Sequence, residues 1–291
     1  MESISDNAPL VVIVGQTASG KSALAMQLAQ KFNAEIIAAD SRTIYKGMDI
    51  GTAKPSLADR RSVSHHLIDI VEPNQLVTVA DFQTLALEAI DGISAKGKLP
   101  IMVGGSGLYV DAVMYGYNFR KRVLVHSRDE LEKASVEELQ SRLKERGIGL
   151  PVNFKNRRHL IGALEVGGVV KDKRHLRGNT LAIGLEVPDE ELMHRIDQRV
   201  EGMLRAGLEE EVRRLVDQFG WDGQPAETIG YTEFRAYFAG DITYEQLVHN
   251  IKTHTRQYSK RQKTWFKRNP DIHWISNSNE AVDLITTFLN K

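Results

Sequence analysis

The 291-residue sequence contains no cysteine, which excludes disulfide bonds, thiolate zinc sites and a cysteine nucleophile. It has no net charge, because 38 Lys and Arg balance 38 Asp and Glu, so any nucleic-acid partner must be recognised by local patches. Apolar runs such as LVVIV at residues 10–14 are far shorter than the roughly 20 residues of a membrane span. The start MESISDNAP lacks a signal peptide's basic and apolar regions. We therefore expect a cytoplasmic protein without a membrane partner.

Strands and helices alternate along the first hundred residues. Short apolar runs rich in β-branched residues predict strands at residues 10–14, 35–39 and 99–103. Helical periodicity begins at Ser22, and Thr78 is placed to cap a second helix. This alternation predicts an α/β fold with a P-loop NTPase-like parallel sheet flanked by helices. Ligands of such folds bind at the carboxyl ends of the strands.

The region between residues 115 and 188 changes character. It contains polar helical stretches at residues 127–147 and 153–166, followed by a basic loop, KDKRHLRGN, and the strand-like LAIGLEV. We interpret residues 115–188 as a smaller, mostly helical insert in a core formed by residues 1–114 and 189–291, and we expect the chain to return to the core near Thr180. The core then continues as helix through residues 191–220.

A long helix is predicted near the carboxyl terminus. Thr243 and Gln246 form a capping box, and the helical pattern continues to about Lys267. Seven Lys or Arg lie between Lys252 and Arg268 with no acidic residue among them. Such a helix suits a phosphate backbone, although taken alone it is more often a solvated basic face.

The stretch GQTASGKS matches the phosphate-binding pattern G-x-x-x-x-G-K-[ST] between the first predicted strand and helix. Backbone N–H groups of such a loop surround phosphate oxygens, Lys21 adds a charge, and the Ser22 hydroxyl reaches a magnesium ion. The alternative is a glycine turn that only packs a helix on a strand. The residues predicted to bind a diphosphate or nucleotide are Gly15, Gln16, Thr17, Ala18, Ser19, Gly20, Lys21 and Ser22, with Ser22 as the metal ligand.

Asp40 follows the second predicted strand, at the same edge of the sheet as the phosphate loop. It suits a general base that takes a proton from an acceptor, or a carboxylate that directs magnesium in a kinase or NTPase. A helix cap or a salt bridge is the structural alternative. The residues alone leave these roles open.

Several motifs occur in the order typical of one family: GQTASGKS, DSRTIYKGMDIGTAKP, HHLIDIVEP, VADF, GGSGLY, GALEV, IGY and TRQYSKRQKTWF. In this the chain resembles bacterial-type tRNA dimethylallyltransferases over nearly its whole length, most weakly between residues 119 and 157. The resemblance implies transfer of a dimethylallyl group from dimethylallyl diphosphate to N6 of the adenosine 3′ of the anticodon. It also implies Mg²⁺, the tRNA anticodon stem-loop as partner, and a monomer.

The same resemblance implies roles for particular residues. Asp40 is the general base. Thr17, Lys21 and Ser22 hold the diphosphate, and Arg199 makes a second cationic contact with it. The implied catalytic residues are Asp40, Thr17 and Arg199. Because the adenine must leave the anticodon stack, we expect a channel with one mouth for the nucleotide and another for the diphosphate. The implied tRNA-binding residues are Asp40, Ser41, Arg42, Thr43, Ser106, Arg128, Arg158, Gly162, Gly230, Tyr231, Arg256, Lys260, Arg261 and Gln262.

Six positions depart from the family pattern, and two of them are mild: Gln16 replaces the usual proline and Ser106 the usual threonine. Thr43 stands where glutamine is usual, and its shorter hydroxyl cannot make the same two-sided contact with adenine. Gly162 and His159 stand where arginine is common, and Asp189 stands where the family often has arginine. The departures at Thr43, His159 and Gly162 predict altered recognition of the acceptor.

Two other classes of function are alternatives to the tRNA prenyltransferase. One is an enzyme that prenylates free AMP or ATP, and the other is a P-loop small-molecule kinase or a binding protein without activity. Nucleotide-prenylating enzymes lack the IGTAKP continuation, and a kinase does not need the basic helix. Both features favour the tRNA prenyltransferase.

Overall fold

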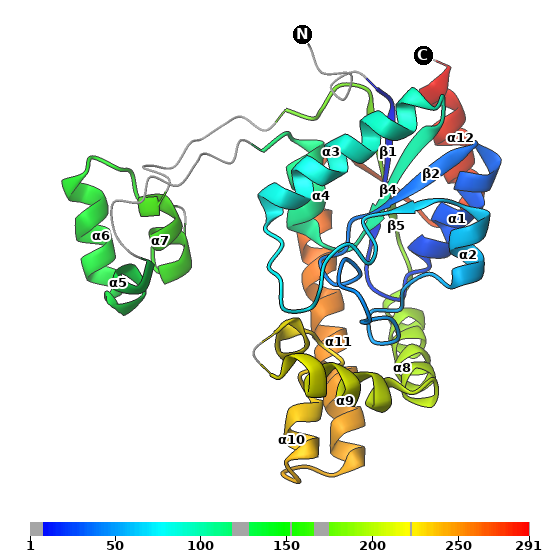
Figure 1. The fold of residues 1–291 in the computed structure, drawn as a ribbon. Helices are drawn as coiled ribbons and strands as arrows, with labels where there is room; N and C mark the ends of the chain where they lie inside the picture. Colours follow the sequence, from blue (N-terminus) through cyan, green and yellow to red (C-terminus); the bar gives the residue numbers. More distant parts are fainter. Residues whose placement is uncertain (1–7, 118–127, 152, 166–174, 222, 291) are drawn as a thin grey trace. The chain divides into compact units, whose positions relative to one another are not determined.

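The structure is a computed structural model that describes residues 8–117, 128–151, 153–165, 175–221 and 223–290. The chain divides into two compact units, one formed by Met1–Gly116 with Leu176–Lys291 and the other by Tyr117–His175 (Figure 1). The strands are β1 (Leu10–Gly15), β2 (Ala34–Ala38), β3 (His65–His66), β4 (Leu99–Gly104), β5 (Thr180–Leu185) and β6 (Ile272–Ile275). The helices of the first unit are α1 (Lys21–Lys31), α2 (Leu57–Ser62), α3 (Val79–Ala95), α4 (Gly107–Met114), α8 (Asp189–Arg205), α9 (Leu208–Phe219), the 3-10 helix η2 (Gln224–Glu227), α10 (Phe234–Phe238), α11 (Tyr244–Lys267) and α12 (Ser278–Leu289).

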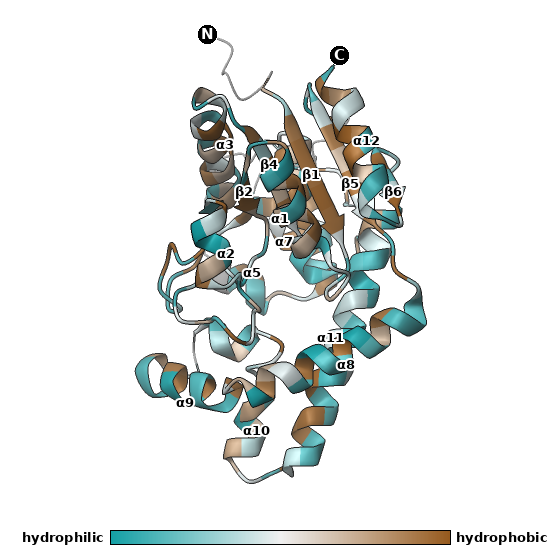
Figure 2. Ribbon diagram, turned by 90° about the vertical axis from the view of Figure 1, so that its right-hand side faces the viewer, coloured by the Kyte–Doolittle hydropathy of each residue, from teal (hydrophilic) through white to brown (hydrophobic). Residues whose placement is uncertain are grey.

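The first unit is built on a six-stranded sheet in the order β3-β2-β4-β1-β5-β6, in which every pairing is parallel. All six residues of β1 are buried, and alternate side chains enter opposite layers. Val12 packs with helices α3 and α4, whereas Val11 and Ile13 pack with α1 and α12. Figure 2 shows the central strands as strongly hydrophobic, whereas the helices carry polar and apolar stripes. The predicted α/β fold is confirmed.

Helices α8 to α11 form a third apolar cluster beyond the carboxyl ends of the strands (Figure 1). Val200, Leu215, Phe234 and Ile251 are fully or almost fully buried in it. Ile44, from the segment that follows β2, packs into the same cluster. The cluster therefore joins the helices to the segment that carries the DSRTIYKGMDIGTAKP motif.

Predicted helix starts are confirmed where a capping box is present. Thr78 caps α3 together with Asp81, and Thr243 caps α11 together with Gln246. The helix expected through residues 191–220 is instead two helices, because Gly207 adopts the left-handed region at φ 96° and ends the α-helical run between α8 and α9.

The second unit contains α5 (Arg128–Lys133), α6 (Val136–Glu145) and α7 (Arg157–Glu165) around its own small apolar cluster. The single helix expected at residues 127–147 is divided at Ser135, whose side chain caps α6 in a capping box with Glu138. The chain is predicted to return to the core near Thr180, and β5 begins there and pairs with β1 in the central sheet. Part of the predicted basic loop lies outside the described residues. No described helix is both long and apolar enough to span a membrane.

Candidate active site

The phosphate loop connects β1 to α1 at the carboxyl edge of the sheet. Gly20 precedes α1 in the left-handed region at φ 94°, and Ala18 has φ 62°. No side chain caps the first turn of α1, so its orphan N–H groups remain suited to an anion. The Ser19 hydroxyl is buried without a hydrogen-bond partner, while Arg195 donates to the Ser19 carbonyl at 3.1 Å.

Lys21 lies across the loop and donates to the Gln16 carbonyl at 3.1 Å. Burial lowers the pKa of the Lys21 ammonium from 10.5 to about 8, and the positive charge of Arg199 acts in the same direction while Asp40 opposes it. Burial also lowers the pKa of Arg199. Two cations are thus held close together, an arrangement that is unfavourable without an anion and favourable with a diphosphate.

Helix α11 holds the phosphate loop from one side. The side-chain Oε1 of Gln262 accepts a hydrogen bond from the Thr17 N–H at 2.7 Å, and the side-chain Nε2 of Gln262 donates to the Gly105 backbone carbonyl at 2.9 Å. Gln16 reaches the same helix and donates to the Ser259 hydroxyl at 2.9 Å. A Cβ at Gly105 would lie 2.2 Å from the Gln262 amide nitrogen, so this bridge requires glycine there. Gln262, a predicted tRNA-binding residue, therefore has a structural role that its sequence motif did not indicate.

Asp40 begins a turn directly after β2. Its Oδ1 accepts the Arg42 N–H at 2.8 Å, and the Ser41 N–H donates to the Ser106 hydroxyl at 2.9 Å. Arg42 in turn hydrogen-bonds to the side chain of Gln224 in η2. Strand ends β2 and β4 thus bring together Asp40, Ser41, Arg42 and Ser106, as the sequence predicts.

Two cavities meet at Asp40. The phosphate-side cavity, of about 430 Å³, is lined by Lys21 and Ser22 and by apolar residues that include Met26 and Ile36. The acceptor-side cavity, of about 340 Å³, is lined by Arg42 and Arg261. Five residues line both cavities: Thr17, Asp40, Thr52, Arg199 and Tyr258. The three predicted catalytic residues are among them, and the arrangement agrees with the predicted channel.

Tyr258 is a site residue that was not predicted. Burial, followed by the negative charge of Asp40, raises the pKa of its hydroxyl to about 12, so the phenol stays protonated and can donate a hydrogen bond. The Arg261 guanidinium lies 5.8 Å from the Tyr258 ring centre.

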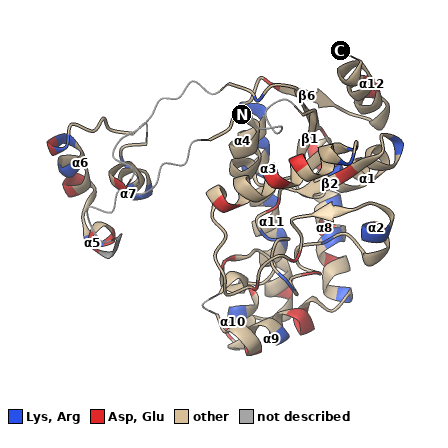
Figure 3. Cartoon of the chain, turned by 45° about the horizontal axis from the view of Figure 1, so that its top comes forward, with Lys and Arg blue, Asp and Glu red and all other residues tan. Residues whose placement is uncertain are grey.

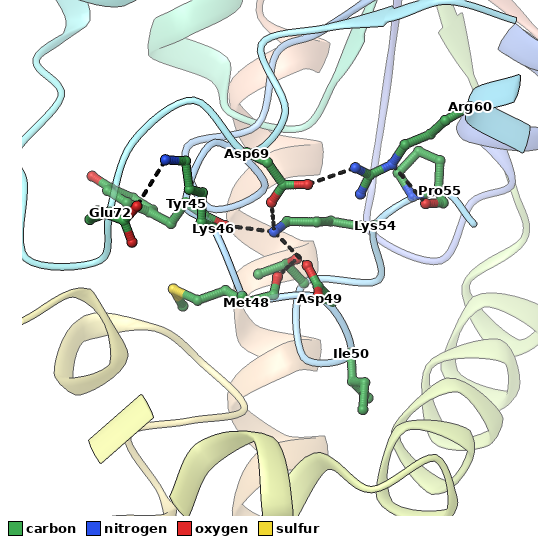
Figure 4. A network of polar contacts seen from close by, with 12 residues as sticks. Tyr45, Lys46, Met48, Asp49, Ile50, Lys54, Pro55, Arg60, Asp69 and Glu72 are labelled. Carbon is green, nitrogen blue, oxygen red and sulfur yellow. Dashed lines mark hydrogen bonds and ion pairs between the residues drawn. The ribbon is translucent and has the colours of Figure 1, made fainter. Parts of the chain in front are cut away.

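The segment from Tyr45 to Lys54 brings Gly51 and Thr52 to the cavities. Lys54 is almost fully buried and pairs with Asp49 at 2.7 Å and Asp69 at 2.5 Å, while its ammonium also donates to the Tyr45 carbonyl (Figure 4). The Thr52 carbonyl accepts from Arg199 at 3.5 Å. Lys54 in the IGTAKP motif therefore fixes the shape of the segment, so the motif has a structural basis.

Helix α11 lies against α8, and Figure 3 marks the Lys and Arg positions of both helices in blue. Arg256 pairs with both oxygens of Asp197 at 2.6 Å, and Lys263 pairs with Asp189 at 2.6 Å. Lys252 and Lys267 pair with acidic residues of α8 and of the segment before it. The expected phosphate-binding face is therefore largely used within the fold. Asp189 gains an explanation, because it is the partner of Lys263.

The predicted tRNA-binding residues fall into different places. Lys260 and Arg261 are exposed on α11, and Gly230 lines the acceptor-side cavity. Tyr231 does not fit the prediction: it is fully buried and donates to Glu211 at 2.6 Å. Thr43 is also buried, and its hydroxyl has no hydrogen-bond partner. The residue lines the phosphate-side cavity, whereas the prediction placed it with the acceptor.

Three further predicted positions belong to the second unit. Arg158 is exposed near the start of α7, next to His159, and space is open beside Gly162 on the same helix. The Arg128 side chain lies outside the described part of the chain. Nothing in the second unit alone tests their binding to RNA, and these assignments stay predictions.

The family model described as IPP transferase matches residues 43–269, most of the chain. The chain belongs to the IPP transferase family. A tRNA dimethylallyltransferase from Roseiflexus sp. (strain RS-1) is 43% identical over 281 residues, which cover 91% of this chain and 92% of that relative. The tRNA dimethylallyltransferase of Bacillus subtilis (strain 168) is 39% identical over 283 residues, with coverages of 92% and 90%.

Solved structures of IPP transferases share the fold. The full-length tRNA isopentenylpyrophosphate transferase from Bacillus halodurans has a TM-score of 0.75 at 36% identity and covers 98% of this chain and 96% of that one. A eukaryotic dimethylallyltransferase acting on tRNA has a TM-score of 0.86 at 27% identity, with coverages of 98% and 80%. The family predicted from the motifs is confirmed.

Proposed function

We propose that this protein transfers the dimethylallyl group of dimethylallyl diphosphate to N6 of the adenosine immediately 3′ of the anticodon in tRNA. The observation that carries the proposal is the shared wall of the two cavities, where Thr17, Asp40 and Arg199 face both spaces. A diphosphate on the loop and an adenine in the other cavity would meet at Asp40. The names of the similar proteins support a dimethylallyl group as the group transferred and tRNA as the acceptor.

The arrangement supports a task for each group in the transfer. A bond forms between N6 and the first carbon of the allyl group, and the bond from that carbon to the diphosphate oxygen breaks. The electron pair of the broken bond leaves on the diphosphate, where Lys21, Arg199 and the loop N–H groups stabilise the growing negative charge. The Asp40 carboxylate accepts the proton that N6 loses. Asp40 is held for this by the Arg42 N–H.

Magnesium fits the residues present, although the protein supplies few ligands. Among the described residues no cluster of three acidic or histidine side chains could hold a metal. Mg²⁺ often keeps several waters and binds through substrate phosphates with one or two protein oxygens. The exposed Ser22 hydroxyl, on the wall of the phosphate-side cavity, is suited to that position. Bound there, the ion would neutralise charge on the departing diphosphate.

The test uses the purified protein with Mg²⁺ and dimethylallyl diphosphate labelled in the allyl group. Separate reactions contain an anticodon stem-loop with adenosine 3′ of the anticodon, the same stem-loop with guanosine there, or AMP. We expect label only in the first reaction. Label in AMP but not in the stem-loop would replace tRNA with a free nucleotide as acceptor. Phosphorylation of a small molecule without prenyl transfer would support a kinase.

A further inference from the structure

Glu211 lies on α9 and lines neither of the two cavities. Only 6% of the residue is exposed, and no ion pair involves it among the described side chains. Burial of a carboxylate is unfavourable unless hydrogen bonds replace its water. A buried carboxylate in this position therefore needs an explanation beyond packing.

The Glu211 carboxylate is surrounded by donors from two separate segments. The N–H groups of Asp49, Ile50 and Gly51 donate to it at distances between 2.9 and 3.1 Å. The Tyr231 hydroxyl donates to Oε1 at 2.6 Å. All these partners donate hydrogen bonds, as a carboxylate requires, because its oxygens can only accept them.

The two segments form adjacent parts of one wall. Gly51 lines the acceptor-side cavity from the first segment, and Gly230 lines it from the turn before Tyr231. The segments also touch directly, because a Cβ on Gly51 would lie 2.3 Å from the Tyr231 ring. Glu211 is therefore the hydrogen-bonding centre that joins these two parts of the wall.

The other fixed point of the first segment is Lys54, through its contacts with Tyr45, Asp49 and Asp69 (Figure 4). Lys54 holds the base of the segment, while Glu211 holds its tip next to Thr52. Thr52 is the residue of this segment that lines both cavities. Loss of Glu211 would release the tip and leave the base fixed.

We propose that Glu211 is a positioning residue that shapes the acceptor-side cavity by fixing Gly51 and Gly230 together. This inference rests on the proposed prenyl transfer to tRNA. Glu211 touches neither substrate. Its effect on diphosphate binding is smaller than its effect on the acceptor, because α11 anchors the phosphate loop separately through Gln262. The tip reaches the diphosphate side through one long hydrogen bond, from Arg199 to the Thr52 carbonyl at 3.5 Å.

The experiment compares wild type with Glu211→Gln, which keeps the size of the side chain but places an amide NH₂ against backbone donors. Glu210→Gln, exposed on the same helix, is the matched control. Tyr231→Phe is a milder variant that keeps the ring against Gly51 and removes one donor. Steady-state transfer to the stem-loop and binding of inorganic diphosphate without RNA are measured for each.

For Glu211→Gln we expect kcat/KM for the stem-loop to fall by about tenfold to a hundredfold, as small misplacements of reacting groups do. Diphosphate affinity should stay within about twofold of wild type, and Tyr231→Phe should show the same pattern more weakly. An equal loss of diphosphate binding, or unchanged kcat/KM in both variants, overturns the role of Glu211. If Glu211→Gln does not fold, Tyr231→Phe alone decides by the same criteria. Absence of transfer by wild type refutes the proposed function instead, and the inference falls with it.

Discussion

Replacing Lys21 with methionine should abolish transfer and at the same time stabilise the protein without ligand. Burial lowers the pKa of Lys21 from 10.5 to about 8, so the charged ammonium costs about 3 kcal/mol at neutral pH. Methionine keeps a long unbranched chain and removes that charge. It also removes the hydrogen bond to the Gln16 carbonyl, which contributes about 1 kcal/mol. The expected net gain is about 2 kcal/mol, or about 4 °C in Tm.

The pH dependence gives this prediction a second, independent measure. Below pH 8 Lys21 is charged in both folded and unfolded protein, so the cost is fully present. Between pH 8 and 10.5 the unfolded chain holds the proton that the folded protein has lost, so wild-type stability rises relative to the variant. The stability difference between Lys21→Met and wild type should therefore shrink across this range.

Thermal unfolding followed by circular dichroism at pH 7, 8, 9 and 10 measures the effect. Lys31→Met, exposed at the end of the same helix, is the control and should change Tm little at any pH. Inorganic diphosphate should raise the Tm of wild type and the control but not of Lys21→Met. A Lys21→Met protein that is less stable than wild type at pH 7, or a difference that does not change with pH, would refute the reasoning.

Other substitutions separate catalytic, RNA-binding and structural roles. Asp40→Asn should lower kcat by about 10² to 10⁴, as expected for loss of a general base, while diphosphate binding measured by calorimetry changes little. Lys260→Gln, at an exposed position, should weaken stem-loop binding and reduce the slope of log K against log salt by about 1. Arg256→Gln should instead leave that slope unchanged and lower stability by up to about 1 kcal/mol, because Arg256 is paired with Asp197. Gln262→Leu should cost about 1–3 kcal/mol and raise KM for dimethylallyl diphosphate, since the Thr17 N–H and the Gly105 carbonyl lose their partner.

Each of these substitutions has a result that contradicts it. Full activity of Asp40→Asn removes Asp40 as the base. An equal change of salt slope in Lys260→Gln and Arg256→Gln would show that the ion pair with Asp197 opens when RNA binds. For Gln262→Leu the control is Gln257→Leu, at an exposed position on the same helix. An equal KM for dimethylallyl diphosphate in the two variants would refute the role of the Gln262 hydrogen bonds in holding the phosphate loop.

The parts of the site that could be predicted from sequence are those where a local pattern has a local cause. The phosphate loop follows from glycine positions between a strand and a helix, and Asp40 follows from its place at the end of β2. Both are consequences of parallel-sheet topology. The helix starts at Thr78 and Thr243 could also be predicted, because each cap is formed by two residues only three positions apart in the chain.

The parts that could not be predicted depend on pairs of residues far apart in the chain. The basic pattern of α11 looks like an RNA surface until the acids of α8, such as Asp197, are placed opposite Arg256. Glu211 appears in the sequence as one of three consecutive glutamates, and only folding shows which of them is buried. Tyr231 was assigned to the acceptor from its motif, although its hydroxyl is occupied by Glu211.

The chain leaves and re-enters the first unit at almost the same point. The Arg177 N–H donates to the Met114 carbonyl at 2.7 Å. This backbone hydrogen bond joins the two ends of the first unit between which Tyr117–His175 is inserted. Because loop closure costs only about 0.6 kcal/mol for each doubling of length, the intervening chain can lengthen, shorten or exchange its sequence without strain on the sheet. A short glycine linker in place of Tyr117–His175 should therefore leave the sheet and phosphate loop folded. Evolution has the same freedom, so the second unit can diverge in length and sequence without disturbing the phosphate loop.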